Sequence, residues 1–368
     1  MQFSFTSEQE EFRSVLRRFL EEKSPPAVVR RLMETEAGWE REGWRELNQQ
    51  LGLTAVHIPE AYGGQGFGPV ELGIVLEETG RALLCAPYFS STVLAATAIM
   101  QAGTEAQKRA LLPDIAAGET IATLAFTEAN GRWDADGIAL RASGKHRLDG
   151  VKSFVLDGHT ADLIVVVARG DAGLSFFTVP GDAPGLTRRA LKVLDPTRKQ
   201  ALLTFDGVEA ELLGEEGAGA APFARTMTLA AVGLANEMVG GAERLRQSAL
   251  DYANLRVQFG RTIASFQSMK HKQADMLVDV ELARSAAYCA AAAAAEGDAE
   301  LPAIASLAKA AAAEAYMQTA IHTIQIHGGI GFTWDNDTHL WFKRAKSSEV
   351  FLGDPAYHRE LMMRAWGA

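Results

Sequence analysis

The feature of this sequence that most constrains its fold is a pattern that changes twice along the chain. From Ser7 to about Gly118, apolar residues recur at helical spacing. Between Thr120 and Gly214 they gather instead in short β-like runs, such as DLIVVVARG and LSFFTVPG, separated by Gly, Pro and Asp turns. Long helical patterns return from Pro222 onward. This order predicts an α+β protein with helical parts at both ends and a compact β domain between them.

The two ends carry separate helix signals. The run SEQEEFRSVLRRFLEE has the pattern of a capping box, Ser7 with Glu10, at its start. The apolar residues that follow it fall at helical spacing: Phe12, Val15, Leu16, Phe19 and Leu20. Near the other end, six alanines follow Cys289. Because alanine is the strongest helix former and permits close packing, we interpret this tract as part of a packed helix.

Composition excludes several classes of function. The chain has 368 residues, 48% of them hydrophobic, which suffices for a large core in two or three lobes. A net charge of -10 argues against nucleic acid or an anionic membrane as the main partner. We see no apolar run long enough to span a bilayer and no secretion-signal pattern at the start. Two cysteines offer neither a disulfide framework nor a metal site, so we expect a cytoplasmic, metal-free protein.

Short motifs narrow the choice of fold. No GxGxxG opens a strand-turn-helix unit and there is no P-loop, so a Rossmann or nucleotide-triphosphatase fold has no support. Five further segments lie in order along the chain: IPEAYGGQGFG (58–68), AFTEANGRWDADG (125–137), GVKSFVLDG (150–158), RVQFGRTIASFQ (256–267) and QIHGGIGF (325–332). These segments resemble signature sequences of the acyl-CoA dehydrogenase flavoproteins. Each is a weak signal alone, but five in order are specific.

This resemblance, which runs essentially end to end, implies the fold of that family. An N-terminal helical domain is followed by a middle β domain and a C-terminal four-helix bundle, with FAD between sheet and bundle. Together with the patterns above, it places the domains at residues 1–119, 120–215 and 216–368.

The last two segments, by this resemblance, reach the ADP part of a FAD that another subunit mainly holds. Arg256 would contact the pyrophosphate, and Gly328 and Gly329 would let the backbone approach a phosphate or adenosine. The residues alone also allow a solvated Arg256 at a helix end capped by Gly260, with the glycine pair as a helix C-cap. The implied cofactor-binding set is Thr127, Arg256, Gln258, Phe259, Phe266, Gln267, Gln325, His327, Gly328 and Gly329.

The residues that a subunit of the family offers to its own flavin differ in this chain. The sequence FVL (154–156) stands where the family reads Trp-Ile-Thr, so the hydroxyl near the reactive flavin nitrogen is lost. Trp133 replaces a serine on the CoA side, and DPA (354–356) replaces Thr-x-Gln. Thr127 remains. The residues that differ are those that would contact the flavin of the same subunit. The residues that would contact the flavin of another subunit are retained.

Both positions of the family's catalytic base lack a carboxylate. Where the family reads Tyr-Glu-Gly-Thr, this chain reads FLGD (351–354), and Leu352 cannot take a proton. Some members place the base in a Glu-Arg pair ten residues before a Gly-x-Ala, and that pair falls here on Ala230 and Ala231.

Three acids lie near these positions. Glu237 is two turns after Ala230 on roughly the same helix face, and Glu349 and Asp354 flank the lost base. We interpret all three as surface or salt-bridge residues, with Glu237 the best candidate if the base has been displaced.

A chain with half a flavin site and no base can complete a site on a partner chain. It is therefore similar to the base-lacking subunit of heteromeric acyl-CoA dehydrogenases of bacterial steroid and related lipid degradation. That resemblance implies a cytoplasmic heterotetramer with FAD, an acyl-CoA substrate and an electron-transfer acceptor. Two alternatives remain open: an active homomeric enzyme with a displaced base, and a non-enzymatic scaffold that has lost flavin.

Overall fold

A computed structural model describes residues 5–367 and confirms the predicted order of helices, strands and helices. The chain forms two compact units, each built from stretches that alternate along the sequence. The unit that we call the helical unit takes the described residues up to Val29, then Pro69–Leu84 and the described residues from Ala231 to Gly367. The sheet unit takes Arg30–Gly68 and Cys85–Ala230. No helix in the described part is long and apolar enough to cross a lipid bilayer.

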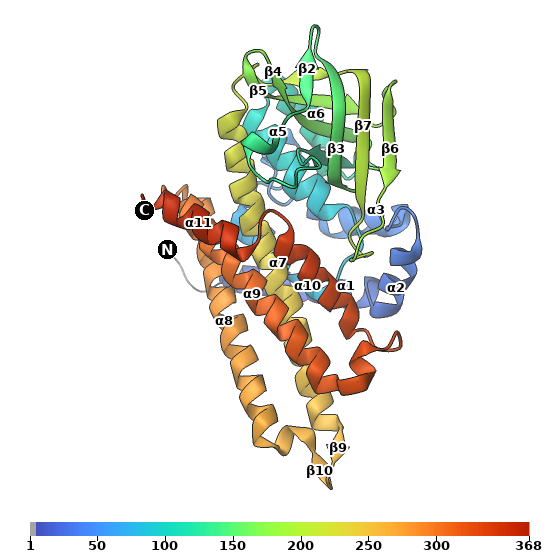
Figure 1. Cartoon of the computed structure of the whole chain (residues 1–368), viewed down its shortest axis with the longest axis vertical. Coiled ribbons are helices and arrows are strands. Elements are labelled where there is room, and N and C mark those ends of the chain that lie inside the picture. The colour runs from blue at the N-terminus through green and yellow to red at the C-terminus, as the bar shows by residue number, and fades with distance from the viewer. Residues whose placement is uncertain (1–4, 368) are drawn as a thin grey trace. The chain divides into compact units, whose positions relative to one another are not determined.

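The sheet unit is built around one eight-stranded sheet (Figure 1). Seven strands run in the order β6-β7-β3-β2-β4-β5-β8, and β1 pairs with β4 in parallel. The other long pairings are antiparallel. The strands are β1 (Ala122–Ala125), β2 (Arg141–Ser143), β3 (Arg147–Leu156), β4 (Leu163–Gly170), β5 (Gly173–Pro180), β6 (Leu186–Ala190), β7 (Gln200–Glu209) and β8 (Glu211–Leu213).

Helices of the same unit precede the sheet in sequence. They include α3 (Arg41–Leu51), the π-helical η3 (Phe89–Ala96), α5 (Thr97–Ala102) and α6 (Glu105–Ala116). A short helix, α2 (Pro26–Glu34), crosses the boundary between the units.

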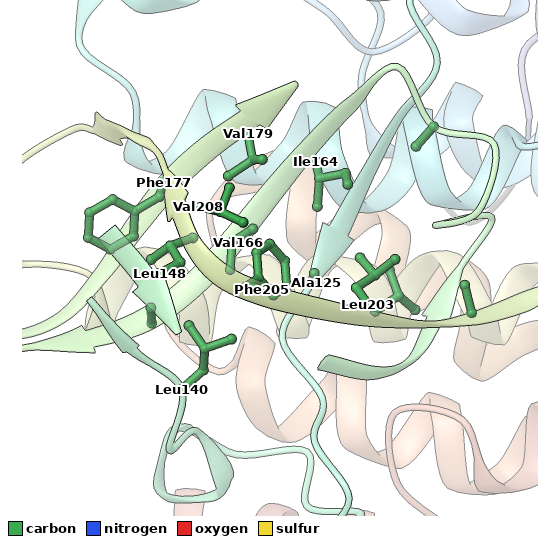
Figure 2. Close-up of a cluster of buried hydrophobic side chains, with 14 residues drawn as sticks. Ala125, Leu140, Leu148, Ile164, Val166, Phe177, Val179, Leu203, Phe205 and Val208 are labelled. Atoms are coloured by element: carbon green, nitrogen blue, oxygen red, sulfur yellow. The ribbon is translucent and has the colours of Figure 1, made fainter. Parts of the chain in front are cut away.

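Alternation of side chains along the strands explains the sheet core (Figure 2). In β7, Ala201, Leu203 and Phe205 are buried and alternate with more exposed residues, because successive side chains of a strand point to opposite faces. They pack with Leu148 of β3 and with residues of β4 and β5 in one apolar cluster. The short β-like runs of the sequence are therefore strands of one core.

The helical unit contains most of the long helices (Figure 1). They are α1 (Ser7–Lys23), α4 (Pro69–Ala82), most of α7 (Ala220–Leu255), α8 (Gln267–Glu296), α9 (Leu301–His327), α10 (Thr338–Val350) and α11 (Pro355–Ala365). The first helix begins at Ser7, one residue before the start that a Ser7 cap predicts, because its capping box is formed by Thr6 and Gln9 rather than Ser7 and Glu10. The six-alanine tract lies in α8, where four of its residues are buried, as expected of a packed helix.

Glycine allows α4 and α7 to approach closely. A Cβ added at Gly240 would lie 1.8 Å from the carbonyl oxygen of Glu77, and one added at Gly80 would lie 2.0 Å from that of Glu237. Neither distance is compatible with a side chain, so the two backbones touch at this crossing.

Candidate functional site

The first cofactor segment predicted from the sequence forms a tight hairpin directly after α7. Strands β9 (Val257–Gln258) and β10 (Arg261–Thr262) pair antiparallel. The two residues between them, Phe259 and Gly260, have φ of 53° and 74°. Positive φ at both central positions is the geometry of a two-residue hairpin turn. Gly260 is therefore a turn residue, and the alternative in which it caps the helix beside Arg256 is wrong.

The hairpin gathers aromatic and cationic groups on an uncovered surface. Phe259 is 92% exposed, and its ring meets that of Phe266 edge-on at 6.1 Å. The guanidinium of Arg261 lies over the Phe266 ring at 4.1 Å. Arg256 and Gln258 are exposed, and Arg256 has no carboxylate partner among residues 5–367. An unpaired cation beside a bare aromatic ring fits an anionic, planar ligand or a second chain.

The second cofactor segment ends α9. Gln325 is exposed, and its Oε1 accepts a hydrogen bond from Lys272 Nζ of α8 at 3.2 Å. His327 is buried, where its ring stacks on Tyr252 of α7 at 4.3 Å and its Nδ1 lies 2.8 Å from the carbonyl oxygen of Thr323. Burial lowers the pKa of His327, so it is a neutral packing residue with little surface for a ligand.

The glycine pair after α9 has two different reasons to be glycine. Gly328 ends the helix with φ of 64°, a conformation that favours glycine. Gly329 has no positive φ, and a Cβ added there meets nothing within 4 Å among the described residues. Packing within the chain does not require glycine at 329. An open backbone at this position fits close approach by a phosphate or an adenosine.

The structure brings these segments together at one end of the helical unit. Ala253 of α7, Met276 of α8 and Ile326 of α9 share a buried cluster, and Ile263 after the hairpin packs against it. Nine of the ten predicted cofactor residues, including Gln267 at the start of α8, lie in this unit. The tenth, Thr127, lies in the sheet unit.

Thr127 shapes a strand bulge rather than presenting a free hydroxyl. Its Oγ1 donates to the carbonyl oxygen of Ser153 at 2.7 Å, and the Ser153 N–H donates back to the Thr127 carbonyl at 2.9 Å. The pairing of β3 with β7 slips between Lys152 and Val155. Phe154, at this irregularity, has φ of 58° and is 43% exposed. The residue that stands for the family's tryptophan is thus turned outward by the bulge.

A buried ion pair that sequence reasoning missed holds the same loop. Lys152 is fully buried, and its Nζ donates to Glu128 Oε1 at 2.7 Å and to the Phe126 carbonyl at 3.2 Å. Burial lowers the pKa of Lys152 to about 8. Glu128 Oε1 also accepts from the N–H groups of Ala139 and Leu140. Lys152 thus links β3 to the residues that follow β1, with its contacts at Phe126 and Glu128 on either side of Thr127.

The loop that carries the family's catalytic base has no carboxylate at the base position in this chain. Hydrogen bonds from a buried lysine fix its backbone. Leu352 is buried and has φ of 62°. Lys309 Nζ donates to the carbonyls of Ser348, Glu349 and Gly353 at 3.1, 2.8 and 2.5 Å. Lys309 was also missed from the sequence, where it is one polar residue in an alanine-rich helical run.

His358 fixes the same loop from α11. Its Nε2 lies 3.0 Å from the carbonyl oxygen of Leu352, so we assign the ring proton to Nε2. Burial, followed by the charge of Lys309, lowers the pKa of His358 to about 4. The backbone around Leu352 is therefore held by a lysine and a neutral histidine.

The three acids near the base positions are held in structural contacts. Glu237 is buried, and its Oε1 accepts from Arg344 Nη1 of α10 at 2.9 Å. Glu349 pairs with Lys346, and Asp354 caps α11 by accepting from the Tyr357 N–H at 2.8 Å. The ion pairs of Glu237 and Glu349 agree with the salt-bridge interpretation of the sequence, and Asp354 is an exposed helix cap.

Comparison with known proteins places the whole chain. Three family profiles match: the acyl-CoA dehydrogenase N-terminal domain at residues 6–119, the middle domain at 123–208 and the C-terminal domain at 217–367. The chain is 33% identical to acyl-CoA dehydrogenase IpdE2 of Mycobacterium tuberculosis, over 97% of this chain and 96% of that one.

Two solved structures are similar over almost their full length. One is the ChsE4-ChsE5 complex of Mycobacterium tuberculosis, with a TM-score of 0.90, 28% identity and coverage of 100% of this chain and 99% of the other. The second is a variant of the Tcur3481-Tcur3483 steroid ACAD, with a TM-score of 0.89, 30% identity and 98% coverage of both chains.

Proposed function

Because this chain belongs to the acyl-CoA dehydrogenase family, whose members are FAD-dependent oxidoreductases, we propose that it completes the FAD site of a catalytic partner subunit. The reaction is the α,β-desaturation of an acyl-CoA thioester. The observation that carries the proposal is the loss of the base: Leu352 stands at one position and Ala230 and Ala231 at the other. All three are buried apolar side chains.

The proposed division of labour follows from what each residue can do. Bound FAD would supply the acceptor for the hydride that leaves the β-carbon of the substrate. Removal of the α-proton needs a base, which the partner supplies, because Leu352 has no group that takes a proton. Arg256 would supply a cation for the pyrophosphate, and Gly329 would let the backbone come close to it. Phe259 covers the ligand or the partner surface beside them.

The similar structures support this assembly. ChsE4-ChsE5 is by its name a complex of two different chains, and the Tcur3481-Tcur3483 protein is likewise a pair and a steroid acyl-CoA dehydrogenase. We therefore propose a heterotetramer of two chain types in steroid or related lipid catabolism in the cytoplasm, with an electron-transfer protein as acceptor.

Flavin content tests the proposal. The chain is purified alone and after co-expression with a family member that carries the Glu, and FAD is quantified by absorbance. We expect little FAD on the lone chain and about one FAD per pair of chains in the complex, by linkage of cofactor binding to assembly. Acyl-CoA-dependent reduction of an artificial acceptor should appear only with the complex.

Two other outcomes would each overturn the proposal. Stoichiometric FAD on the lone chain, with turnover that falls by at least ~100-fold in Glu237→Gln, would make it an active homomer with a displaced base. Absence of FAD under any pairing, with the fold intact by circular dichroism, would make it a scaffold.

A further inference from the structure

A lysine of the helical unit lies beside one of the predicted cofactor residues and was not predicted from the sequence. Lys272 of α8 is partly buried, and its Nζ lies 3.2 Å from Gln325 Oε1 and 3.5 Å from His322 Nδ1, both on α9. Its ammonium group is therefore held between two acceptors of one neighbouring helix. Met276, one turn after Lys272, and Ile326, next to Gln325, belong to one buried apolar cluster, which keeps these parts of α8 and α9 together.

Lys272 determines which end of the Gln325 amide remains available to a ligand. An ammonium group has three donors and no acceptor, so the amide atom that meets it is the oxygen. The Nε2 group of Gln325 then lies on the other side of the amide, where it has no acceptor among residues 5–367. Because Gln325 is exposed, this amide is presented to a ligand as a hydrogen-bond donor.

His322 holds Lys272 in this position. A ring nitrogen that accepts from a lysine carries no proton, so we assign the ring proton of His322 to Nε2. A neutral imidazole fixes the ammonium group without neutralising its charge. Lys272 is thus anchored to α9 by His322 while it donates to Gln325.

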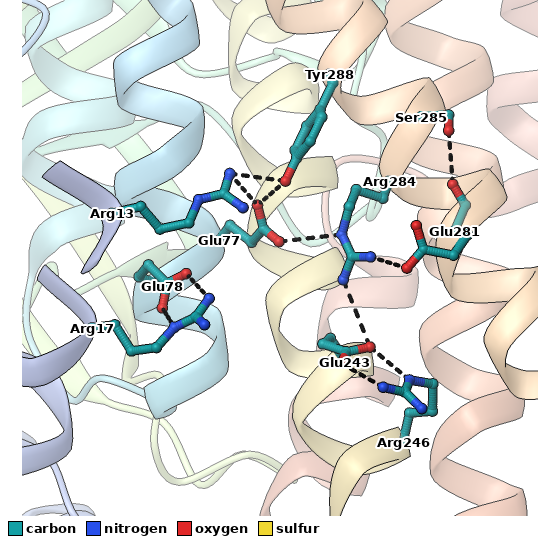
Figure 3. A network of polar contacts seen from close by, with 10 residues as sticks. All are labelled: Arg13, Arg17, Glu77, Glu78, Glu243, Arg246, Glu281, Arg284, Ser285 and Tyr288. Atoms are coloured by element: carbon teal, nitrogen blue, oxygen red, sulfur yellow. Dashed lines mark hydrogen bonds and ion pairs between the residues drawn. The ribbon is translucent and has the colours of Figure 1, made fainter. Parts of the chain in front are cut away.

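Arg284, further along α8, shows the contrast (Figure 3). Its Nε lies 3.4 Å from Glu77 Oε1 and its Nη2 lies 3.6 Å from Glu243 Oε2, so carboxylates of the chain neutralise it. Lys272 has no carboxylate partner in the described part of the chain, and both of its contacts are to uncharged groups. Its charge takes no part in an ion pair of the fold, and it fits beside an anionic ligand.

The donor end of Gln325 belongs to the same helix end as the glycine pair. The Gly328 N–H donates to the Gln325 carbonyl where α9 ends. At Gly329, the next residue, an added Cβ meets nothing within 4 Å among the described residues. A ligand group that approaches this open backbone and also bonds the Gln325 amide must carry hydrogen-bond acceptors.

We propose that Lys272 is a positioning residue of the FAD site, which holds the Gln325 amide so that its N–H donors face acceptors of the ADP part of FAD. This role rests on the function proposed above, since Gln325 is assigned to FAD by the family resemblance. Lys272 lies outside that assigned set. Its role holds whether the second chain is a different family member or another copy of this one.

Binding of FAD to the complex, after its flavin has been removed, measures this role. FAD is titrated into complexes that contain the unaltered chain, Lys272→Met or Lys272→Arg, and flavin fluorescence is followed. Methionine has similar length but no donor, so we expect the Kd for FAD to rise by about 3- to 10-fold, the scale of one hydrogen bond. Arginine keeps donors and should hold the Kd within about 2-fold of the original.

A double-mutant cycle determines whether Lys272 acts through Gln325. If it does, Lys272→Met should have no further effect in a Gln325→Ala background, because no amide remains to be oriented. Gln325→Glu is a second check on the direction of the contact. Its carboxylate still accepts from Lys272 but offers no N–H, so FAD binding should weaken at least as much as in Gln325→Ala.

Lys270→Met is the matched control. Lys270 is an exposed lysine of the same helix, two residues before Lys272 and therefore about 200° around the helix axis from it. This change should leave the Kd for FAD unaltered. Thermal unfolding of the lone chain should be the same with and without Lys272→Met, because the contact with Gln325 is exposed.

Two results would overturn the role of Lys272. One is an unchanged Kd for FAD in Lys272→Met while the unaltered complex binds FAD, which would leave the proposed function intact. The other is an equal effect of Lys272→Met with and without the Gln325 amide, which would make the lysine a direct contact. Absence of FAD from the unaltered chain under any pairing would overturn the proposed function and the role of Lys272 together.

Discussion

At the residue scale, the acids near the missing base show how a contact decides a role. Glu237 lies on the helix that carries the base in some relatives, yet Arg344 engages it in a buried ion pair. Such a pair contributes little net stability over apolar residues, but removing one partner takes a counter-charge away from the other, buried charge. The contact with Arg344 therefore gives the Glu237 carboxylate a structural role.

Glu237→Gln should therefore separate stability from turnover. We expect the free energy of unfolding to fall by roughly 3 kcal/mol, because Arg344 keeps its charge in a buried site. Turnover of the complex should stay within about a few-fold of the original, since the base lies elsewhere. Urea denaturation and acceptor reduction measure the two effects.

Glu314→Gln is the control for this change. Glu314 also pairs with an arginine, Arg359, but on the surface, so its loss should cost no more than ~1 kcal/mol. Equal losses in the two variants would show that burial of the Glu237 pair does not matter.

His358 predicts a pH dependence of stability. Its pKa falls from 6.5 to about 4 on folding, so between these values the unfolded chain binds more protons than the folded one. Stability from this group is complete above pH 6.5 and is lost as the pH falls toward 4, by ~2 kcal/mol at pH 5. Denaturation at pH 5 and pH 8 should show this difference. In His358→Gln the difference should shrink by that amount, and an unchanged difference would assign the acid sensitivity to other groups.

At the element scale, the crossing of α4 and α7 depends on glycine. Gly240→Ala would place a methyl group 1.8 Å from the Glu77 carbonyl oxygen, so the helices must separate. We expect a loss of at least ~3 kcal/mol, the upper end for overpacking, measured by thermal unfolding. Gly43→Ala is the opposite control, because Gly43 lies exposed in α3 with nothing within 4 Å. That change should be neutral or stabilise by up to ~1 kcal/mol, since alanine is the better helix former.

Local patterns in the sequence predicted the helices and strands well, but not the caps and turns at their ends. The helix from Ser7 was predicted because apolar spacing is a property of consecutive residues. Its cap is formed by Thr6 and Gln9 instead. Thr6 and Ser7 are adjacent and can both cap a helix, and only the backbone decides between them. The hairpin at Phe259 and Gly260 was missed, since only one of its two turn residues is glycine.

Contacts between residues that lie far apart in the sequence could not be predicted from local patterns. Lys309 meets the loop around Leu352 from far along the chain, and Lys152 reaches Glu128 across the sheet unit. No periodicity links such positions. The family resemblance located the segments of the candidate site, but not the bulge that turns Phe154 outward.

At the scale of the whole molecule, three features of the candidate site are not covered by the described chain. Arg256 is unpaired, Gly329 faces open space and Phe259 is uncovered among the described residues, all at one end of the helical unit. A surface of this kind is expected where a ligand or a second chain completes it. The same residues contribute little to the fold of the chain by itself.

Arg256→Ala tests this view. FAD retention in the complex should weaken by at least ~10-fold, the scale of one charge-assisted contact to the pyrophosphate. The lone chain should unfold at the same temperature as before, because the exposed Arg256 has no carboxylate partner in its described part. Arg364→Ala, which alters an exposed arginine of α11, should change neither property. If the FAD content did not change in Arg256→Ala, Arg256 would be only a solvated residue beside the hairpin.

The bare ring of Phe259 also bears on the amounts in which a cell must make this chain. An aromatic side chain left in water is the kind of surface that promotes aggregation and brings incompletely assembled proteins to chaperones and proteases. Under the assembly proposed above, copies synthesised beyond the supply of the partner keep that ring uncovered and are removed. Balanced production of the two chains, as from a single transcript, then governs how much enzyme accumulates.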